Sequence, residues 1–140
     1  AAGTDVIAML NMDMVGRNFE ATPGCDIIGT QFSPDIRAMI EIESKVTGLK
    51  ELNFKPGTDN MRLLERSDQG PFYKRDVPIA FFSTGLHKDY HQLTDHWDLI
   101  NYGNMEKIGR TILRVAVALA NGDGKPAFVK SQDSGQTGGR

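Results

Sequence analysis

A nearly unbroken run of apolar residues close to the start of the chain limits its fold more than any other feature. Residues 6–12 read Val-Ile-Ala-Met-Leu-Asn-Met, and Asp13 follows at once. Such a run is typical of a central strand that is covered on both faces of an α/β sheet. Open α/β sheets bind ligands outside the carboxyl ends of their strands, so Asp13 is a candidate functional residue.

The following segments show helix and strand patterns in turn. Ser33-Pro34-Asp35 combines a capping residue, a first-turn proline and an acid, which predicts a helix to about Thr47 that ends at Gly48. Its expected buried stripe is Ile36, Met39, Ile40 and Val46. Strands are expected at 25–29, 49–54 and 77–82, with a turn at 56–60.

Two more helices are expected in the second half of the chain. Ser67 and Asp68 are expected to cap a short helix, and Asn104 to open a last helix that closes at 121–122. The apolar face of this last helix is Met105, Ile108, Ile112, Val115 and Leu119. We therefore predict an α/β fold with a mixed β-sheet flanked by helices in residues 1–128, and a disordered tail at 129–140.

Composition excludes several classes of function. A chain of 140 residues fits one domain, and its formal net charge of −2, with scattered Lys and Arg, offers no basic surface for nucleic acid. No apolar run approaches the roughly 20 residues that span a bilayer, so no membrane span is expected. The single cysteine, Cys25, excludes an internal disulfide and a Cys-rich zinc site. A metal would therefore need His and carboxylate ligands.

All three histidines of the chain lie within residues 87–96, in a polar loop between a predicted buried strand and the last helix. Loops after strands are where binding and catalytic sites are built. Imidazole and carboxylate groups together suit zinc, but their spacing here matches no closed zinc motif. From the cluster alone, a solvated loop with ordinary surface histidines is the alternative interpretation.

Three short segments resemble the zinc aminopeptidases of metallopeptidase family twenty-eight. Residues 11–17, Asn-Met-Asp-Met-Val-Gly-Arg, look like the strand-end zinc aspartate of that family. Residues 66–72, Arg-Ser-Asp-Gln-Gly-Pro-Phe, resemble its Ser-Asp-His segment, with Gln69 where the family often has histidine. Tyr90-His91 with Asp95 resembles the Tyr-His pair that ends the site. The segments occur in the order of the family, within residues 5–121.

The resemblance implies roles for four residues in a zinc-dependent exopeptidase that releases N-terminal residues from peptide substrates. Asp13 would bind one zinc ion and His91 the other, in a complete site with two ions. Tyr90 would donate its hydroxyl to the developing oxyanion, and Arg66 would contact substrate or product. Structural roles remain the alternatives: Asp13 as the cap of a turn, and Tyr90 as a packed loop aromatic.

Other polar residues of these segments are not expected to be ligands. Asp68 and Asp95 are interpreted as capping groups or as outer contacts of the site, because the ligand set of the family omits both. His87 and His96 are interpreted as surface residues or outer contacts.

The remaining residues of the family's site would lie before the Asp13 strand. These are a first histidine, a bridging aspartate, and a catalytic Glu beside a Glu ligand, and this chain contains no Glu-Glu pair. We therefore expect the C-terminal part of a larger aminopeptidase catalytic domain, inactive alone, with self-association through surface left by truncation. The alternatives are an enzyme like glutaminyl-peptide cyclotransferase and a non-catalytic binding module. Bacterial members are commonly exported, so a periplasmic or secreted protein is expected, although this chain carries no signal.

Overall fold

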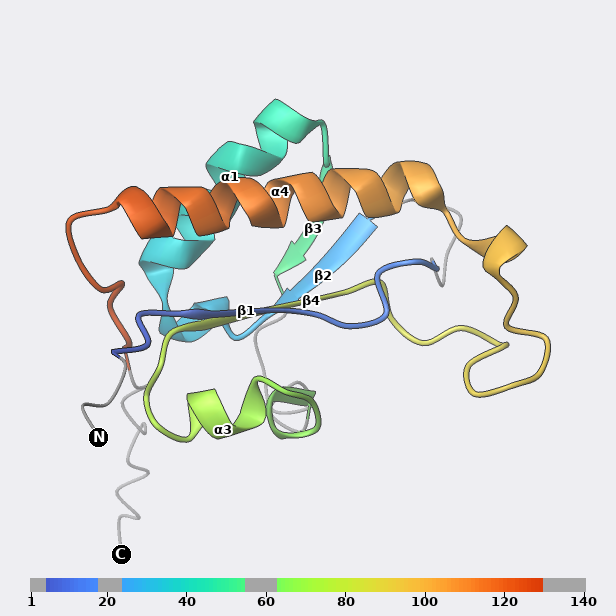
Figure 1. Ribbon diagram of the computed structural model, residues 1–140, viewed down its shortest axis with the longest axis horizontal. Coiled ribbons are helices and arrows are strands. Elements are labelled where there is room, and N and C mark those ends of the chain that lie inside the picture. Colours follow the sequence, from blue (N-terminus) through green and yellow to red (C-terminus); the bar gives the residue numbers. More distant parts are fainter. Residues whose placement is uncertain (1–4, 18–23, 55–62, 130–140) are drawn as a thin grey trace, which may run out of the picture.

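Four strands form one mixed sheet, and helices cover both of its faces (Figure 1). The computed structural model describes residues 5–17, 24–54 and 63–129. The strands are β1 (Met9–Met12), β2 (Gly24–Ile28), β3 (Glu51–Phe54) and β4 (Ile79–Ser83). The helices are α1 (Pro34–Thr47), α3 (Gly70–Tyr73) and α4 (Tyr102–Asn121), with 3-10 turns η1 (Thr30–Phe32) and η2 (Trp97–Leu99). The α/β prediction with a mixed sheet is confirmed.

The sheet has the strand order β1-β4-β2-β3. β1 runs parallel to β4, β2 runs parallel to β3, and β2 runs antiparallel to β4. The expectation that the first apolar run forms a central strand is wrong for the described residues, where β1 is one of the two edge strands and Met12 is 52% exposed. An apolar run indicates that both faces of a strand are covered. It does not indicate which strands pair with it, because those strands lie far away in sequence.

β4 is the central strand of the described sheet, and all five of its residues are buried. Its side chains alternate between two cores, as the two-residue period of a strand requires. Ala80 and Phe82 face the core under α1 and α4, and Ile79 and Phe81 face the core on the opposite side. Figure 1 shows α1 and α4 over one face of the sheet and α3 over the other.

The two long helices pack against each other through small side chains. Ile36, Ile40 and Ser44 form the buried face of α1, and the Oγ1 atoms of Thr47 and Thr111 are 2.6 Å apart. Val46, expected in this stripe, is 61% exposed instead. Ile36, Ile40 and Ser44 stand at positions i, i+4 and i+8, which share one face of a helix.

Three of the four ends of α1 and α4 lie where the sequence predicted them. α1 begins after Ser33 as expected, but the Ser33 hydroxyl makes no capping hydrogen bond. α1 ends at Gly48, whose φ of 74° is the left-handed conformation that glycine adopts without strain. α4 begins at Tyr102, earlier than the expected Asn104, because the Asn101 side chain accepts a hydrogen bond from the Asn104 backbone N–H at 3.1 Å. No helix in the described part of the chain is long and apolar enough to cross a membrane.

Candidate functional site

Asp13 follows β1 directly and lies beside the end of β4. Its backbone N–H donates to the Phe82 carbonyl at 3.1 Å, and its side chain is exposed. The Ser67 hydroxyl donates to Asp13 Oδ2 at 3.0 Å. The expectation that Ser67 caps the short helix is therefore wrong: α3 begins after Gln69, and no side chain caps it.

Hydrogen bonds whose directions can be assigned connect this carboxylate to buried polar side chains. Gln69 is fully buried, and its Nε2 donates to the backbone carbonyls of Leu63 at 2.7 Å and Leu64 at 3.2 Å. Carbonyls only accept, so Gln69 must present Oε1 to Asn11, whose Nδ2 donates to it at 2.8 Å and to Ser67 Oγ at 3.1 Å. The hydroxyl hydrogen of Ser67 is thus left for Asp13, and one carboxylate oxygen is oriented by the buried network.

Tyr90 and His91 lie on the loop that follows β4, with stacked rings. Their ring centroids are 3.9 Å apart with an interplanar angle of 21°. His91 has a φ of 57°, and Met14, next to Asp13, has a φ of 61°. Left-handed backbone is uncommon outside glycine and is often found at functional sites, where the surrounding structure holds it in place. The backbone is therefore strained at His91 and at Met14, the residue next to Asp13.

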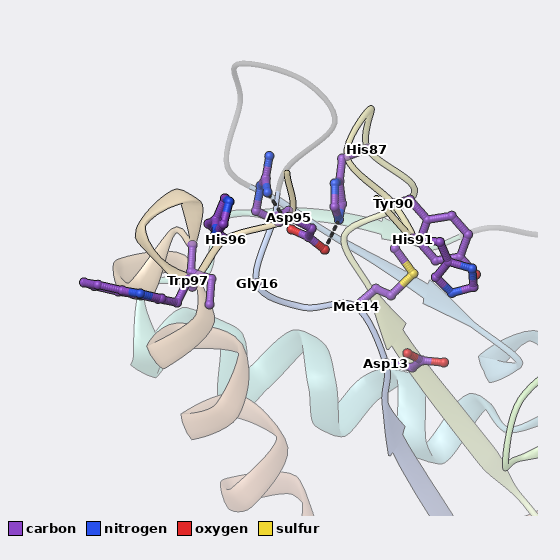
Figure 2. Close-up of a pocket in the computed structure, with 11 residues that line it drawn as sticks. Asp13, Met14, Gly16, His87, Tyr90, His91, Asp95, His96 and Trp97 are labelled. Carbon is purple, nitrogen blue, oxygen red and sulfur yellow. Dashed lines mark hydrogen bonds and ion pairs between the residues drawn. The ribbon is translucent and has the colours of Figure 1, made fainter. Parts of the chain in front are cut away.

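One cavity brings these side chains together. It has a volume of about 670 Å³ and is lined by Asp13, Tyr90 and His91 along with Met14, Gly16, Arg17, His87, Asp95, His96, Trp97 and Ile100 (Figure 2). A second cavity of about 330 Å³ shares Asp13, Met14 and Tyr90 with the first, and Arg66 lies in its wall. All four residues assigned a role from the sequence therefore line this pair of adjoining cavities.

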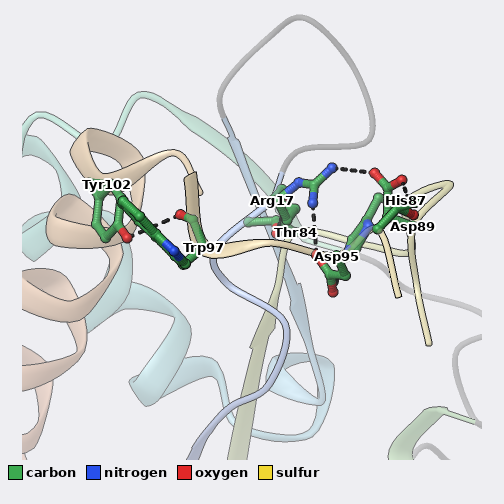
Figure 3. A network of polar contacts seen from close by, with 8 residues as sticks. Arg17, Thr84, His87, Asp89, Asp95, Trp97 and Tyr102 are labelled. Atoms are coloured by element: carbon green, nitrogen blue, oxygen red, sulfur yellow. Dashed lines mark hydrogen bonds and ion pairs between the residues drawn. The ribbon is translucent and has the colours of Figure 1, made fainter. Parts of the chain in front are cut away.

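Arg17 connects the segment after β1 to residues 87–96, which carry the three histidines and are called the histidine loop below (Figure 3). Its guanidinium donates to Asp89 at 2.6 Å and to Asp95 at 2.7 Å, and its side chain is only 15% exposed. The Arg17 hydrogen bond, with a second one from the Thr94 hydroxyl, holds the pKa of Asp89 below its ordinary value. One side chain thus bridges two carboxylates on either side of Tyr90 and His91.

Backbone contacts fix the segment that carries Arg17. The Thr84 N–H donates to the Met14 carbonyl at 2.9 Å, and the Thr84 hydroxyl donates to the carbonyls of Met14 and Arg17. The Asn101 N–H donates to the Gly16 carbonyl at 2.8 Å. The residue after β4 and the residue before α4 therefore both fix the backbone of the segment that follows Asp13.

The structure also places the polar residues that were not expected to be ligands. Asp95 pairs with Arg17, and its Oδ2 lies 3.7 Å from Nε2 of His87. The His87 side chain is only 9% exposed, which excludes the surface interpretation for it, whereas His96 is exposed. Sequence reasoning missed Arg17, Asn11 and Gln69; the only available signal was their place inside the two motifs.

Asp13 and His91 fit a zinc site as a partial donor set. A carboxylate and an imidazole that line one cavity are ligand types that zinc accepts, and the Ser67 contact is the kind of outer hydrogen bond that orients a metal ligand. Within residues 5–17, 24–54 and 63–129, no three His, Cys, Asp or Glu side chains form a group that could hold a metal ion.

Comparisons with known proteins concern the family and the fold of the chain. Peptidase family M28 matches residues 2–116. The LapA aminopeptidase of Legionella pneumophila is similar in structure, with a TM-score of 0.64 and 17% identity over 82% of this chain and 32% of LapA. BSAP, a zinc aminopeptidase from Bacillus subtilis, gives a TM-score of 0.59 and 16% identity over 86% of this chain and 31% of BSAP. No curated protein matched the chain. The chain spans about a third of these structures, whose likeness shows the fold.

Proposed function

Because the chain belongs to peptidase family M28, we propose that it is the part of a zinc-dependent aminopeptidase domain that supplies Asp13 and His91 as metal ligands. The membership confirms the family that the sequence motifs indicated. The observation that carries the proposal is the single cavity lined by both side chains, with strained backbone at His91 and beside Asp13. The further donors would come from the two thirds of the relatives' length that this chain does not span.

The chain's own residues have separate roles in the proposed reaction. A pair of zinc ions would supply an activated water and polarise the carbonyl of the first peptide bond. Tyr90 lines the cavity beside Asp13 and would donate its hydroxyl to the developing oxyanion. Arg66 lines the adjoining cavity and would contact the substrate or product. Ser67 would keep one oxygen of Asp13 oriented while the other faces the metal.

We infer that the parent protein is the active exopeptidase and that this chain alone has no peptidase activity. General-base catalysis has no candidate, since the sequence contains no Glu-Glu pair. An aminoacyl-nitroanilide assay of the parent tests the aminopeptidase, whereas conversion of an N-terminal glutaminyl peptide into the pyroglutamyl peptide, with release of ammonia, would favour the cyclotransferase alternative. A peptide substrate and a periplasmic or secreted location, as is common for the family in bacteria, belong to the same proposal.

Self-association is proposed for the chain as it stands. β1 is one of the two edge strands of the described sheet, and the nearby side chains of Val6 and Met12 are 39% and 52% exposed. An exposed, apolar strand edge is a template for pairing with a second copy. We expect size-exclusion chromatography to show a dimer or larger species at high concentration; a monomer at every concentration would contradict this.

The zinc ligands are tested by removing them one at a time. In the metal-free 140-residue chain, Asp13→Ala and His91→Ala are each expected to weaken zinc binding at least about tenfold, because each removes one of two donors. Ser67→Ala, which keeps both donors and removes the hydrogen bond to Asp13, is expected to weaken binding less than either. Isothermal titration calorimetry with Zn²⁺ measures all three.

Asp98→Ala is the matched control for the carboxylate. Asp98 is exposed and close in sequence to the histidine loop, but it does not line the cavity. It should bind zinc as the unmodified chain does, and circular dichroism should show the same fold for every variant. Unchanged zinc affinity in both Asp13→Ala and His91→Ala would show that the assigned ligands are wrong.

A further inference from the structure

Two cavities of different character meet at Asp13, Met14 and Tyr90. The smaller one, of about 330 Å³, has an apolar wall formed by Ile28, Leu63, Phe81 and Leu86. The larger one, of about 670 Å³, extends from Asp13 and His91 to Gly16, His96, Trp97 and Ile100. In Figure 2, Trp97 lies on the opposite side of the group from Tyr90 and His91. The candidate zinc ligands and Trp97 therefore lie on opposite sides of the group of residues that lines the larger cavity.

An enzyme that removes one residue at a time needs two unequal spaces beside its scissile bond. One space holds the first side chain, and the other must let the rest of the peptide continue. The smaller cavity, which has one apolar wall, fits a single side chain, and the larger cavity has about twice its volume. This assignment rests on the proposed aminopeptidase function, and it leaves the larger cavity for the peptide downstream of the cleaved bond.

The far end of the larger cavity carries an exposed aromatic side chain. Trp97 is the only tryptophan of the chain and is 74% exposed. Its backbone is held in η2, and its carbonyl accepts a hydrogen bond from the Tyr102 hydroxyl at 3.1 Å. Tryptophan is rarely left so open to solvent, and a tryptophan fixed at the rim of a cavity is a typical binding surface for an apolar group.

His87 gives a second, independent indication of a ligand in this cavity. Its side chain is 9% exposed and lines the cavity wall, and its Nδ1 atom has no hydrogen-bond partner among the described residues. A buried polar atom without a partner is destabilising, and a bound polar group restores the lost bond.

We propose that the larger cavity binds the peptide segment downstream of the cleaved bond and that Trp97 stacks on an apolar or aromatic side chain of that segment. The substrate class is therefore peptides of three or more residues, preferred over dipeptides and amino-acid amides. Because the stacking contact is made by residues of this chain, it forms without zinc and without the rest of the domain.

Three probes test this: leucinamide, Leu-Gly-Gly and Leu-Gly-Phe, each titrated into the zinc-free 140-residue chain. Nuclear magnetic resonance follows the single indole N–H signal of Trp97 and the backbone amides of residues 88–92. Leu-Gly-Phe is expected to shift the indole signal and to bind about three- to tenfold more tightly than Leu-Gly-Gly, the range of an added aromatic contact. Leucinamide is expected to leave the indole signal unchanged.

Variants separate the stacking contact from a general loss of structure. Trp97→Ala should lower the affinity for Leu-Gly-Phe to that for Leu-Gly-Gly, as read from the amides of residues 88–92, and Trp97→Phe should restore most of it. Leu113→Ala, which shortens a 64% exposed side chain on α4 outside both cavities, should change nothing. Equal affinities for the two tripeptides, or full affinity in Trp97→Ala, would overturn the inference. The outcome of these peptide titrations does not depend on the outcome of the zinc titrations. A failure of the Trp97 contact can therefore be distinguished from a wrong assignment of the zinc ligands.

Discussion

Replacing Phe82 with alanine is expected to lower the free energy of unfolding by about 4 kcal/mol. Phe82 is fully buried in β4, between Met12 of β1 and Ile27 of β2 in the sheet register. Its ring lies in the core under α1 and α4, with Ile108 and Val115 in the same cluster. Alanine would leave a cavity where the sheet meets both helices, and such interiors relax only partly. Urea denaturation followed by circular dichroism measures the change.

Two further variants make this result specific. Phe82→Leu keeps most of the apolar volume and should cost clearly less than alanine. Val117→Ala removes a 51% exposed side chain from the outer face of α4 and should change stability by no more than about 0.5 kcal/mol. If Phe82→Ala destabilised the chain no more than Val117→Ala, the central place of β4 in the core would be wrong.

Segments with a strong local pattern were predictable from the sequence. The run at 77–82 became the buried strand β4, and the helical period of Ile108, Ile112, Val115 and Leu119 became the buried face of α4. Gly48 ended α1 as expected. These features are set by neighbouring residues, through side-chain period and backbone conformation, so a local pattern contains the information.

Features that depend on distant partners were not predictable. The Ser67 hydroxyl satisfies Asp13, 54 positions away, instead of the helix beside it, and Asn11 reaches 58 positions to Gln69. A serine followed by an acid has the same local sequence whether it caps a helix or bonds to a distant carboxylate. Only the folded structure shows which contact the serine makes. The turn expected at 56–60 and residues 130–140 of the tail expected at 129–140 lie outside the described residues. Val129, the first residue of that tail, is ordered enough to donate its N–H to the Phe32 carbonyl at 2.7 Å.

The candidate site shows the same division. Motif order identified Asp13 and His91, and the structure places both at one cavity. The histidine loop alone indicated no fixed geometry, because its shape depends on Arg17, which lies 72 residues before Asp89. The electrostatic contact that fixes the loop is therefore the part of the site that local sequence could not reveal.

Replacing Arg17 with methionine is expected to release the histidine loop and lower the Tm by roughly 5 °C or more. Methionine keeps the length of an apolar stem but leaves Asp89, with only 10% of its side chain exposed, without its cationic partner. The loss should extend to the loop, because Arg17 bridges Asp89 and Asp95 on both sides of His91. Thermal unfolding measures the stability, and hydrogen exchange at residues 88–95 should rise.

Acid should reduce this difference between the variant and the unmodified chain. The pKa of Asp89 is lowered in the folded state from an ordinary value of 3.8, so its pairing stabilises the fold above about pH 4. That contribution is lost as the pH falls through the lowered pKa, because the carboxylate is then protonated in both chains. The two Tm values are therefore expected to be furthest apart at pH 7 and to converge below pH 4.

Arg110→Met is the matched control for the loss of an arginine. Arg110 pairs with Glu106 at 3.3 Å on the surface of α4, where both side chains are about two thirds exposed, and such pairs contribute little to stability. Arg17→Lys should recover only part of the stability, since a lysine cannot present the planar fork that reaches two carboxylates at once. If Arg17→Met were as stable as Arg110→Met, with unchanged exchange at residues 88–95, the loop would owe its shape to backbone contacts alone. The strained φ of His91 would then be maintained without Arg17.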